Sequence, residues 1–354
     1  MTKEKLSIMV AVLKNRLLPL KNPFFCTYIV TFRCNAKCRM CDIWKKKAQQ
    51  EMDLEQIKKA FAKIKEIVVV RLTGGEPFLR KDILDISNII KENTACKILH
   101  VTSNGILKDN IIDFAKNSKF NNLHIKISLT GAKASHDFNL GINGAWDKAL
   151  ETIEALKAIK RGRNFFLAVN HTITDWQSFL DSKEIRRLCS ELKLGYLPVL
   201  AYQGPSLYAD QQEKIDERRD FKPFTDFSQE QLREIFIELK ANCKNIPDFF
   251  ERAIKKYYLK GLSNRLLKDH EFPRPRCIAL SKHIRFLPNG DIAVCLYNSQ
   301  IVGNIVRDEL STILSSPKAK ELQNWVNSCS DCWAECEVIP NALIKEKIPI
   351  LFRL

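Results

Sequence analysis

Cys34-Asn-Ala-Lys-Cys38-Arg-Met-Cys41 is the stretch of sequence that decides the fold, because it sets three cysteines in a C-x3-C-x2-C spacing. It follows residues 24–31, an apolar run with the β-branched and aromatic residues that are typical of a strand. Iron–sulfur clusters are held by cysteine thiolates, so three thiolates this close together can bind three irons of a four-iron cluster. The fourth iron then has no protein ligand nearby and stays open to a small molecule.

These cysteines also allow two other interpretations. Structural zinc binds clustered cysteines, but usually through paired C-x2-C units, and no second such pair lies near Cys41. A disulfide framework is disfavoured, because 12 cysteines in 354 residues is a modest number and no signal peptide precedes them. The spacing therefore favours a metal centre in a reducing, cytoplasmic location.

Length and composition indicate a globular protein with one large domain and a smaller one. Hydrophobic residues make up 45% of the 354 residues and charged residues 28%, which is ordinary for such proteins. No apolar run is long enough to span a bilayer. Residues 6–20 are apolar but are interrupted by charged residues and Pro19, which predicts a short helix packed on the domain. Association of this helix with a membrane surface is the alternative.

The net charge of +16 suits an acidic partner, such as a phosphate-bearing substrate or an anionic membrane surface. The basic residues are spread along the chain, and neither a paired zinc finger nor an aromatic RNA-binding strand accompanies them. Nucleic acid is therefore not an expected partner.

Apolar, β-branched runs alternate with helical patterns over the first two-thirds of the chain. The predicted strands cover 24–31, 67–73, 97–102, 123–129, 164–171 and 195–201. Near-continuous apolar strands joined by helices predict a parallel sheet that is covered on both faces or curled into a barrel. Asp53 and Gln56 match a capping box, which predicts that one of the helices begins there.

The rest of the chain has a different pattern. Charges are dense from 203 to 275, strand signals vanish, and helices are predicted at 228–243 and 247–259. Farther on, two apolar runs flank Asn289-Gly290, a strong signal for a β-hairpin. Cysteines gather around and after this hairpin, at 277, 295, 329, 332 and 336. The isolated cysteines are expected to be buried hydrophobic residues: Cys26, Cys96, Cys189 and Cys243.

Together these motifs resemble the radical S-adenosylmethionine (radical SAM) enzymes. The resemblance rests on the three cysteines after the first strand, on Met40 before the third cysteine, and on Gly74-Gly75-Glu76-Pro77 at the end of the second strand. It implies an α/β fold, a partial (β/α)6 barrel similar to a TIM barrel, with the site at the C-terminal edge of the strands. In that family a [4Fe-4S] cluster reductively cleaves S-adenosylmethionine to a 5′-deoxyadenosyl radical, which abstracts hydrogen from a substrate.

The resemblance also implies which residues bind the cofactor. Gly74, Gly75 and Glu76 are expected at its amino group, where carbonyls and a carboxylate suit an ammonium. Four polar residues at later strand ends are expected to line it: Ser103, Asn104, Ser128 and Asn170. Each of the four could equally be a turn or cap residue. Thr130 stands where family members often have an aspartate, so it receives no role, and no catalytic acid or base is assigned.

The C-terminal cysteines resemble a SPASM or twitch auxiliary-cluster domain. Cys277, Gly290 and Cys295 fit the spacing with which that domain opens. Cys329, Cys332 and Cys336 complete a set of five, too few for the two clusters of a full SPASM domain. The expectation is one auxiliary [4Fe-4S] cluster, with structural zinc as the alternative.

The predicted organisation has five segments. They are an N-terminal helix over 1–19, the partial barrel over 20–205, a helical bridging segment over 206–275, a hairpin-plus-helix cysteine-rich domain over 276–340 and a tail over 341–354.

The leading functional hypothesis is a cytoplasmic radical SAM enzyme that takes electrons from a donor such as ferredoxin or flavodoxin. A small or conjugated anionic substrate is favoured, such as a sugar, nucleotide or lipid headgroup, because of the basic charge. The residues before Phe24 are too few for the leader-binding domain that many peptide maturases carry there, although a peptide-modifying maturase is the closest alternative. A non-catalytic protein that uses its cysteines for zinc, or binds nucleic acid, is the alternative from a different class.

Overall fold

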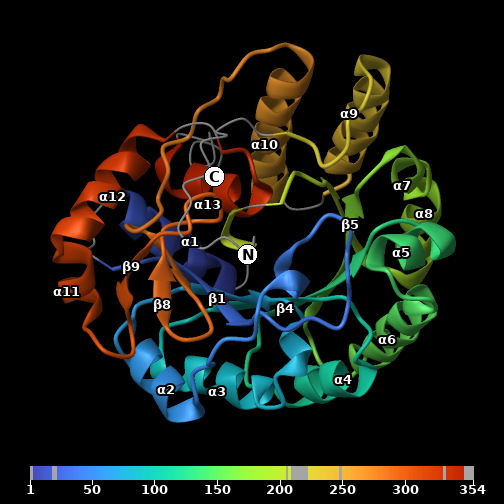
Figure 1. Cartoon of the computed structure of the whole chain (residues 1–354). Coiled ribbons are helices and arrows are strands. Elements are labelled where there is room, and N and C mark those ends of the chain that lie inside the picture. The colour runs from blue at the N-terminus through green and yellow to red at the C-terminus, as the bar shows by residue number, and fades with distance from the viewer. Residues whose placement is uncertain are drawn as a thin grey trace.

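The computed structural model describes residues 3–17, 22–204, 206–208, 222–246, 249–329 and 332–346. Within this part the chain forms an α/β fold on one nine-stranded sheet, in the order β6-β5-β4-β3-β2-β1-β7-β8-β9 (Figure 1). The first six strands are β1 (Phe25–Thr31), β2 (Val69–Gly74), β3 (Ile98–Ser103), β4 (Leu123–Leu129), β5 (Phe166–Ile173) and β6 (Gly195–Leu200). All neighbours among them pair in parallel. The predicted partial (β/α)6 barrel is confirmed.

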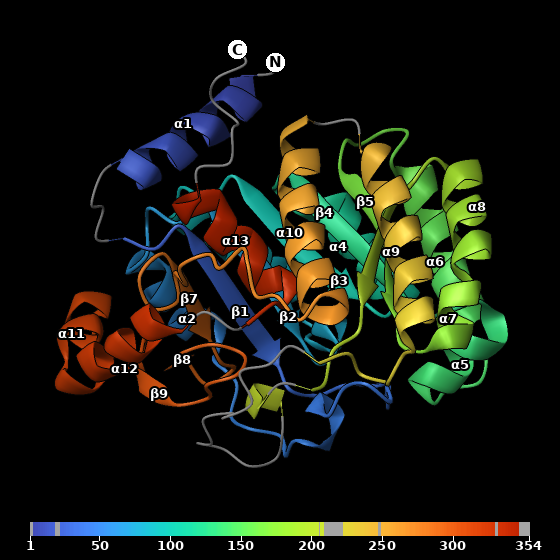
Figure 2. The same ribbon diagram turned by 90° about the horizontal axis from the view of Figure 1, so that it is seen from above.

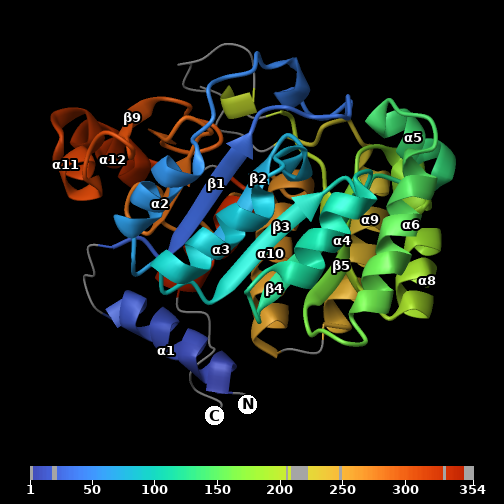
Figure 3. The same cartoon turned by 90° about the horizontal axis from the view of Figure 1, so that it is seen from below.

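Helices cover the outer face of this sheet, as the arc in Figure 1 and the view in Figure 3 show. They are α2 (Leu54–Ala62), α3 (Ile83–Asn93), α4 (Lys108–Asn117), α5 (Lys133–Leu140), α6 (Ala145–Ile159), α7 (Trp176–Leu180) and α8 (Ser182–Leu192). The core lies between these helices and the strands, where Phe61 and Phe114 pack with Tyr28 and Ile125. Asp53 and Gln56 form the expected capping box at the start of α2.

The two faces of the strands differ in what they bury. In β4, Leu123, Ile125, Ile127 and Leu129 are buried, whereas the residues between them keep part of their accessible surface. The same alternation runs through β3. The interior of a closed barrel is filled by layers of packed side chains. Here the side chains on the inner face keep part of their accessible surface, and we call the region that they line the barrel lumen. Its half-buried lining comprises Arg71, Thr73, His100, Thr102, His124, Lys126, Ser128, Asn170, Thr172 and Leu197.

The cysteine-rich segment continues the same sheet. The strand β7 (His283–Phe286) pairs in parallel with β1, and the predicted hairpin follows as β8 (Asp291–Ala293), antiparallel to β7. Gly290 occupies the turn with a φ of +85°, a conformation that favours glycine. The last strand, β9 (Ile301–Asn304), pairs with β8, and α11 (Leu310–Ser315) and α12 (Pro317–Ser328) follow it. The cysteine-rich part and the barrel therefore share one sheet.

Three further helices lie on the lumen side or beside it. They are α9 (Gln229–Lys244), α10 (Phe249–Leu267) and α13 (Glu335–Lys345). Figure 1 shows α10 and α13 on the opposite side of the strands from α2, α3 and α4, and Figure 2 shows α10 and α13 in front of the strands. Buried Trp333, just before α13, packs with Tyr258 and donates a hydrogen bond from Nε1 to the Tyr258 carbonyl (3.0 Å).

The N-terminal helix α1 (Lys3–Leu17) packs near α13, and its Arg16 Nε donates to the Leu343 carbonyl at 2.7 Å. Residues 341–345 of the predicted tail form the end of α13. Residues 18–19, 209–221 and 347–354 of the predicted segments lie outside the described residues. Among the helices that the structure describes, none is both long and apolar enough to cross a membrane.

Candidate functional site: two cysteine groups at the strand ends

The first cysteine group lies in the loop that leaves the C-terminal end of β1. Cys34, Cys38 and Cys41 are half-buried free thiols. Burial is the main cause that raises the pKa of Cys34 to about 11 and of Cys38 to about 12, and the charge of the neighbouring Cys41 adds to both. The backbone N–H of Ala36 points at Cys34 Sγ (3.4 Å), the kind of hydrogen bond that tunes a thiolate ligand. Met40 is half-buried in the turn before Cys41.

The cysteine loop is held against the end of β2 by backbone contacts. Gly75 N–H donates to the Thr31 carbonyl and Glu76 N–H donates to the Arg33 carbonyl, both at 2.9 Å. A Cβ added at Gly75 would lie 2.0 Å from the Arg33 carbonyl oxygen, and one at Gly74 would lie 2.2 Å from that of Thr31. Only glycine permits this approach, because any side chain would force the two loops apart.

Glu76 is buried between the ends of β2 and β3. Its carboxylate accepts hydrogen bonds from the Ser103 hydroxyl (2.9 Å), the Asn104 backbone N–H (2.8 Å) and the Phe78 N–H (3.2 Å). Burial raises the pKa of Glu76 to about 7, against the opposing effect of these donors. Pro77 starts the short helix η2 (Pro77–Leu79) and is also buried. In this structure Ser103 and the Asn104 backbone therefore hold Glu76 in place.

The remaining predicted cofactor residues lie at the same edge. The Asn104 side-chain amide donates to Asn35 Oδ1 (2.7 Å), which ties the end of β3 to the cysteine loop. Ser128 of β4 and Asn170 of β5 are register partners and both face the barrel lumen. Asn170 Nδ2 also donates to Thr172 Oγ1 at 3.5 Å. The fold thus brings these residues toward one edge of the sheet, from the ends of β1, β2 and β3 and from the inner faces of β4 and β5.

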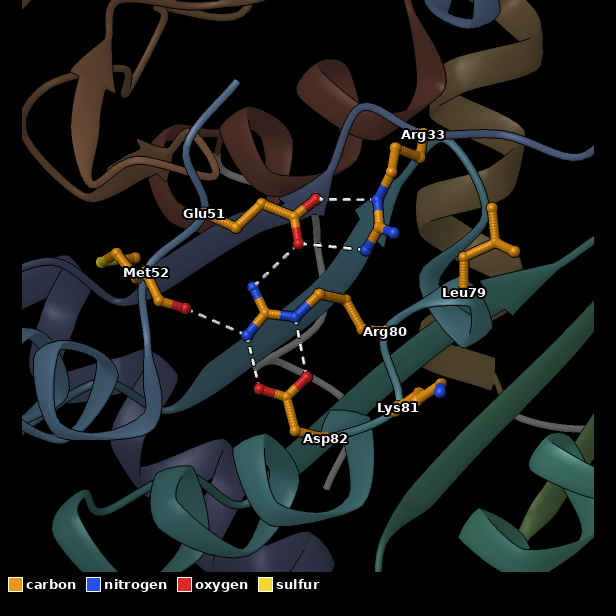
Figure 4. Close-up of a pocket in the computed structure, with 7 residues that line it drawn as sticks. All are labelled: Arg33, Glu51, Met52, Leu79, Arg80, Lys81 and Asp82. Carbon is orange, nitrogen blue, oxygen red and sulfur yellow. Dashed lines mark hydrogen bonds and ion pairs between the residues drawn. The ribbon is translucent and has the colours of Figure 1, made fainter. Parts of the chain in front are cut away.

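A cavity of about 350 Å³ lies beside this loop, lined by Arg33, Glu51, Met52, Leu79, Arg80, Lys81 and Asp82 (Figure 4). Its side chains form a chain of ion pairs. Arg33 and Arg80 share the Glu51 carboxylate, at 3.2 and 3.4 Å, and Arg80 also pairs with Asp82 at 2.6 Å. Sequence reasoning missed this network, because Glu51 lies 18 residues from Arg33 in the chain and its second partner, Arg80, comes from another loop.

The second cysteine group surrounds the β7–β8 hairpin and the start of α13. Five cysteines belong to this group and all are half-buried: Cys277, Cys295, Cys329, Cys332 and Cys336. The Asn298 N–H donates to Cys295 Sγ (3.2 Å), and the Ala279 N–H donates to Cys277 Sγ (3.5 Å). Charges on this group act on one another: Cys295 raises the pKa of Cys277 and of Cys332, in both cases after burial as the main cause.

One apolar cluster separates the two cysteine groups. It consists of Ile29, Phe32, Ile43, Leu207, Leu287, Ala293 and Leu296. Cys34, Cys41 and Cys336 all pack against it, so both groups share a water-poor wall. Across the described part of the chain, no three His, Cys, Asp or Glu side chains are close enough to hold a single metal ion. Thiol donors with backbone N–H groups at their sulfurs, beside apolar residues, fit iron–sulfur clusters in their chemistry.

Helix α13 is anchored in the barrel lumen by two ion pairs on either side of Cys336, one half-buried and one buried. Glu335 accepts from Lys255 Nζ of α10 with both oxygens at 2.9 Å. Glu337 pairs with Arg285 of β7, and His283 Nδ1 lies 3.4 Å from its other oxygen. Although burial acts in the opposite direction, Arg285 and His283 hold the pKa of Glu337 well below its usual range. The second cysteine group is thereby fixed relative to the barrel.

Residues 28–182 match the family model of the radical SAM superfamily, and residues 277–333 match that of an iron-sulfur cluster-binding domain, SPASM. Among curated proteins, the GTP 3′,8-cyclases of Edwardsiella ictaluri (strain 93-146) and Vibrio vulnificus (strain YJ016) are 29% and 27% identical to the chain over 152 residues. The alignments cover 38% of this chain and 46% and 45% of the cyclases. The chain therefore spans less than half of the length of these curated relatives.

Solved structures share the fold across most of the chain. Streptococcus suis SuiB bound to S-adenosylmethionine has a TM-score of 0.61 at 17% identity, over 90% of this chain and 72% of that one. The complex of SuiB with precursor peptide SuiA has a TM-score of 0.60 at 17% identity, over 90% of this chain and 71% of that one. Native anSMEcpe with bound AdoMet and Cp18Cys peptide has a TM-score of 0.55 at 15% identity, over 84% of this chain and 81% of that one. At these identities the likeness concerns the fold.

Proposed function

We propose that this chain, a member of the radical SAM superfamily with a C-terminal SPASM iron–sulfur domain, is an enzyme that uses S-adenosylmethionine to abstract hydrogen from an anionic substrate. The observation that carries the proposal is the first cysteine group. Cys34, Cys38 and Cys41 stand at the C-terminal edge of the strands, locked by backbone contacts to Gly75 and Glu76. That edge is where barrel folds place their chemistry.

The cysteines of each group would hold one [4Fe-4S] cluster. Cys34, Cys38 and Cys41 bind the first, and four of the five C-terminal cysteines bind the auxiliary one. When bound and reduced, the first cluster supplies the electron that cleaves S-adenosylmethionine to a 5′-deoxyadenosyl radical. The residues proposed to bind S-adenosylmethionine are Met40, Gly74, Gly75, Glu76, Pro77, Ser103, Asn104, Ser128 and Asn170.

The chain's own contribution is positioning and exclusion of water. Gly74 and Gly75 let the end of β2 lie directly against the cysteine loop, so the cofactor's polar end meets backbone groups there. Glu76 offers a carboxylate that Ser103 and Asn104 orient. Such a fixed acceptor suits the ammonium of an amino-acid group. The apolar cluster behind Cys34 and Cys41 keeps water from the sulfurs.

A small or conjugated anion is the substrate class that the barrel lumen supports. Arg71 and Lys126 face this space, and both carry charge into a region otherwise shielded from solvent. The matching GTP 3′,8-cyclases act, by their name, on a nucleotide, which is itself such an anion. A peptide-modifying maturase is the second candidate, because SuiB with precursor peptide SuiA and anSMEcpe with a bound peptide share the fold.

The proposed partners follow from the same chemistry. An electron donor such as ferredoxin or flavodoxin would reduce the clusters in the cytoplasm.

The deciding experiment incubates anaerobically reconstituted protein with S-adenosylmethionine, dithionite and pools of phosphorylated small molecules or peptides. We expect 5′-deoxyadenosine release that phosphorylated molecules stimulate. Stimulation by peptides alone would refute the small-molecule substrate, and absence of any release would refute the activity.

A further inference from the structure

An unpaired lysine lies in the middle of the barrel lumen. Lys126 is the central residue of β4 and points to the inner face, between the layer of His124 and the layer of Ser128. The register places it beside Thr102 of β3 and Ala168 of β5. Ser128 and its register partner Asn170 are proposed to face S-adenosylmethionine. Lys126 is therefore one layer deeper in the lumen than the cofactor.

The ammonium of Lys126 makes no hydrogen bond or ion pair with the residues that the structure describes. Burial, and after it the neighbouring Arg71, lowers its pKa to about 8. At neutral pH the side chain is thus still charged although it is half-buried in the protein. A buried charge without a partner is costly, and proteins normally pair such groups.

The nearby carboxylates are already engaged elsewhere. Glu335 is held by Lys255, with both oxygens at 2.9 Å, and Glu337 is held by Arg285. Glu251, the other carboxylate that acts on Lys126, is on the exposed side of α10. None of the three carboxylates has an oxygen within hydrogen-bond distance of the Lys126 ammonium.

The groups around Lys126 are cationic or neutral. Arg71 of β2 faces the same space, and its Nη1 donates to the Cys336 carbonyl at 2.7 Å. His100 and His124 lie next to each other, with ring centroids 4.6 Å apart, and burial lowers the pKa of both, so they are neutral. The buried Nδ1 of His100 also has no hydrogen-bond partner within the described residues. A positive charge and an orphan polar atom thus lie on the same inner face of the sheet.

We propose that Lys126 binds an oxyanion of the substrate, a phosphoryl or carboxylate group, with Arg71 adding charge and His100 a hydrogen bond. The inference rests on the proposed function and specifies where the substrate's charged group sits. Anchoring at this depth would place the rest of the substrate one layer higher, against the cofactor at Ser128 and Asn170. An ammonium is a compact charge that suits a phosphoryl or carboxylate oxygen.

Anion binding to the cluster-loaded protein tests the proposal directly. Isothermal titration calorimetry with inorganic phosphate, and separately with succinate, is compared between wild type and Lys126→Gln. We expect one anion to bind wild type, and Lys126→Gln to weaken that binding by about tenfold or more. Lys126→Arg should restore much of it. Lys116→Gln, which removes an exposed lysine on the outer helix α4, is the matched control and should bind as wild type does.

A labelling measurement keeps the test decisive if Lys126→Gln fails to fold. Wild-type protein is treated with a small amine-reactive reagent at pH 8 and modification of Lys126 is followed by peptide mass spectrometry. The binding anion should slow labelling at Lys126 but not at Lys116. Protection by phosphate indicates a phosphoryl group, and protection by succinate alone indicates a carboxylate. If neither anion binds or protects, or if Lys126→Gln binds as wild type does, the proposal is overturned.

The proposed function is tested separately in the same wild-type samples. Release of 5′-deoxyadenosine under dithionite reports the radical SAM activity without any added anion. If 5′-deoxyadenosine is released but anion binding does not depend on Lys126, only the anion site is refuted. Absence of release would refute the activity, whatever the anions do.

Discussion

The Asn104 side-chain amide donates a hydrogen bond to Asn35 Oδ1 at 2.7 Å, and this contact joins the end of β3 to the cysteine loop. The Asn104 backbone N–H at the same time donates to Glu76 (2.8 Å). One residue thus connects the loop of Cys34 with the carboxylate that ends β2. The site is held by contacts between loops that are distant in sequence.

Asn104→Ala should weaken S-adenosylmethionine binding by about fivefold while leaving the iron content unchanged, because it removes one side-chain link worth about 1 kcal/mol and no thiol. Equilibrium binding of S-adenosylmethionine to the oxidised protein measures the effect. Asn110→Ala is the control, since the Asn110 side-chain amide also donates one hydrogen bond, to the Phe78 carbonyl, but lies on the exposed side of α4. Equal binding by both variants would contradict a role for Asn104 at the cofactor.

Glu76 should make stability fall as pH rises. Burial raises its pKa in the folded protein from 4.5 to about 7, so its contribution is fully present below 4.5 and is lost as pH rises through about 7. A shift of this size corresponds to about 3 kcal/mol. Glu76→Gln removes the titration, so between pH 5 and pH 8 the free energy of unfolding of wild type should drop relative to that of Glu76→Gln.

Urea unfolding of both proteins under anaerobic conditions at the two pH values measures this difference. Any pH-independent effect of the glutamine amide on the free energy of unfolding cancels, because only the change between the two pH values is compared. Parallel pH profiles for the two proteins would show that Glu76 ionises normally.

Gly75→Ala should prevent the first cluster from assembling. Its Cβ would lie 2.0 Å from the Arg33 carbonyl oxygen, so the loop that carries Cys34 has to move away from β2. We expect about four irons to be lost per chain, with the auxiliary cluster retained. Gly162→Ala is the control, because its nearest neighbour is 4.0 Å away and its backbone needs no glycine. Full iron content in Gly75→Ala would rule out the proposed tight contact.

Glu337→Gln should destabilise the protein by about 3–5 kcal/mol, since it leaves the buried Arg285 without its carboxylate. The auxiliary cluster should load poorly, because Glu337 fixes the helix that begins beside Cys336. Chemical unfolding and iron content report the two effects. Glu191→Gln breaks the exposed pair with Arg187 and should change stability by less than about 1 kcal/mol. Similar stabilities of the two variants would show that this anchor is unimportant.

Much of the fold could be predicted from sequence because its signals are local. The six strand predictions match β1 to β6 within a few residues, and the Asn289-Gly290 turn predicts the β7–β8 hairpin. The isolated cysteines are buried, as expected, at positions 26, 96, 189 and 243. These features depend on periodicity and turn chemistry, which are written in consecutive residues.

The rest depends on contacts between distant segments. No pattern near His283 predicts that its strand pairs in parallel with β1, so that the barrel and the cysteine-rich part share one sheet. The sequence likewise does not indicate that Lys126 points into the barrel lumen, because the direction of its side chain follows from the register of the neighbouring strands. Glu335 and Glu337 look like ordinary charged helix residues until Lys255 and Arg285 are seen opposite them.

The central claim is that Cys34, Cys38 and Cys41 hold a four-iron cluster that cleaves S-adenosylmethionine. The most direct measurement is iron, zinc, sulfide and 5′-deoxyadenosine in anaerobically reconstituted protein reduced with dithionite, for wild type and for a variant with Cys34, Cys38 and Cys41 changed to alanine. We predict about eight irons per wild-type chain and about four in the variant, with nucleoside release only from wild type. A colourless wild-type protein that contains zinc instead of iron, or one that releases no 5′-deoxyadenosine, would contradict the claim.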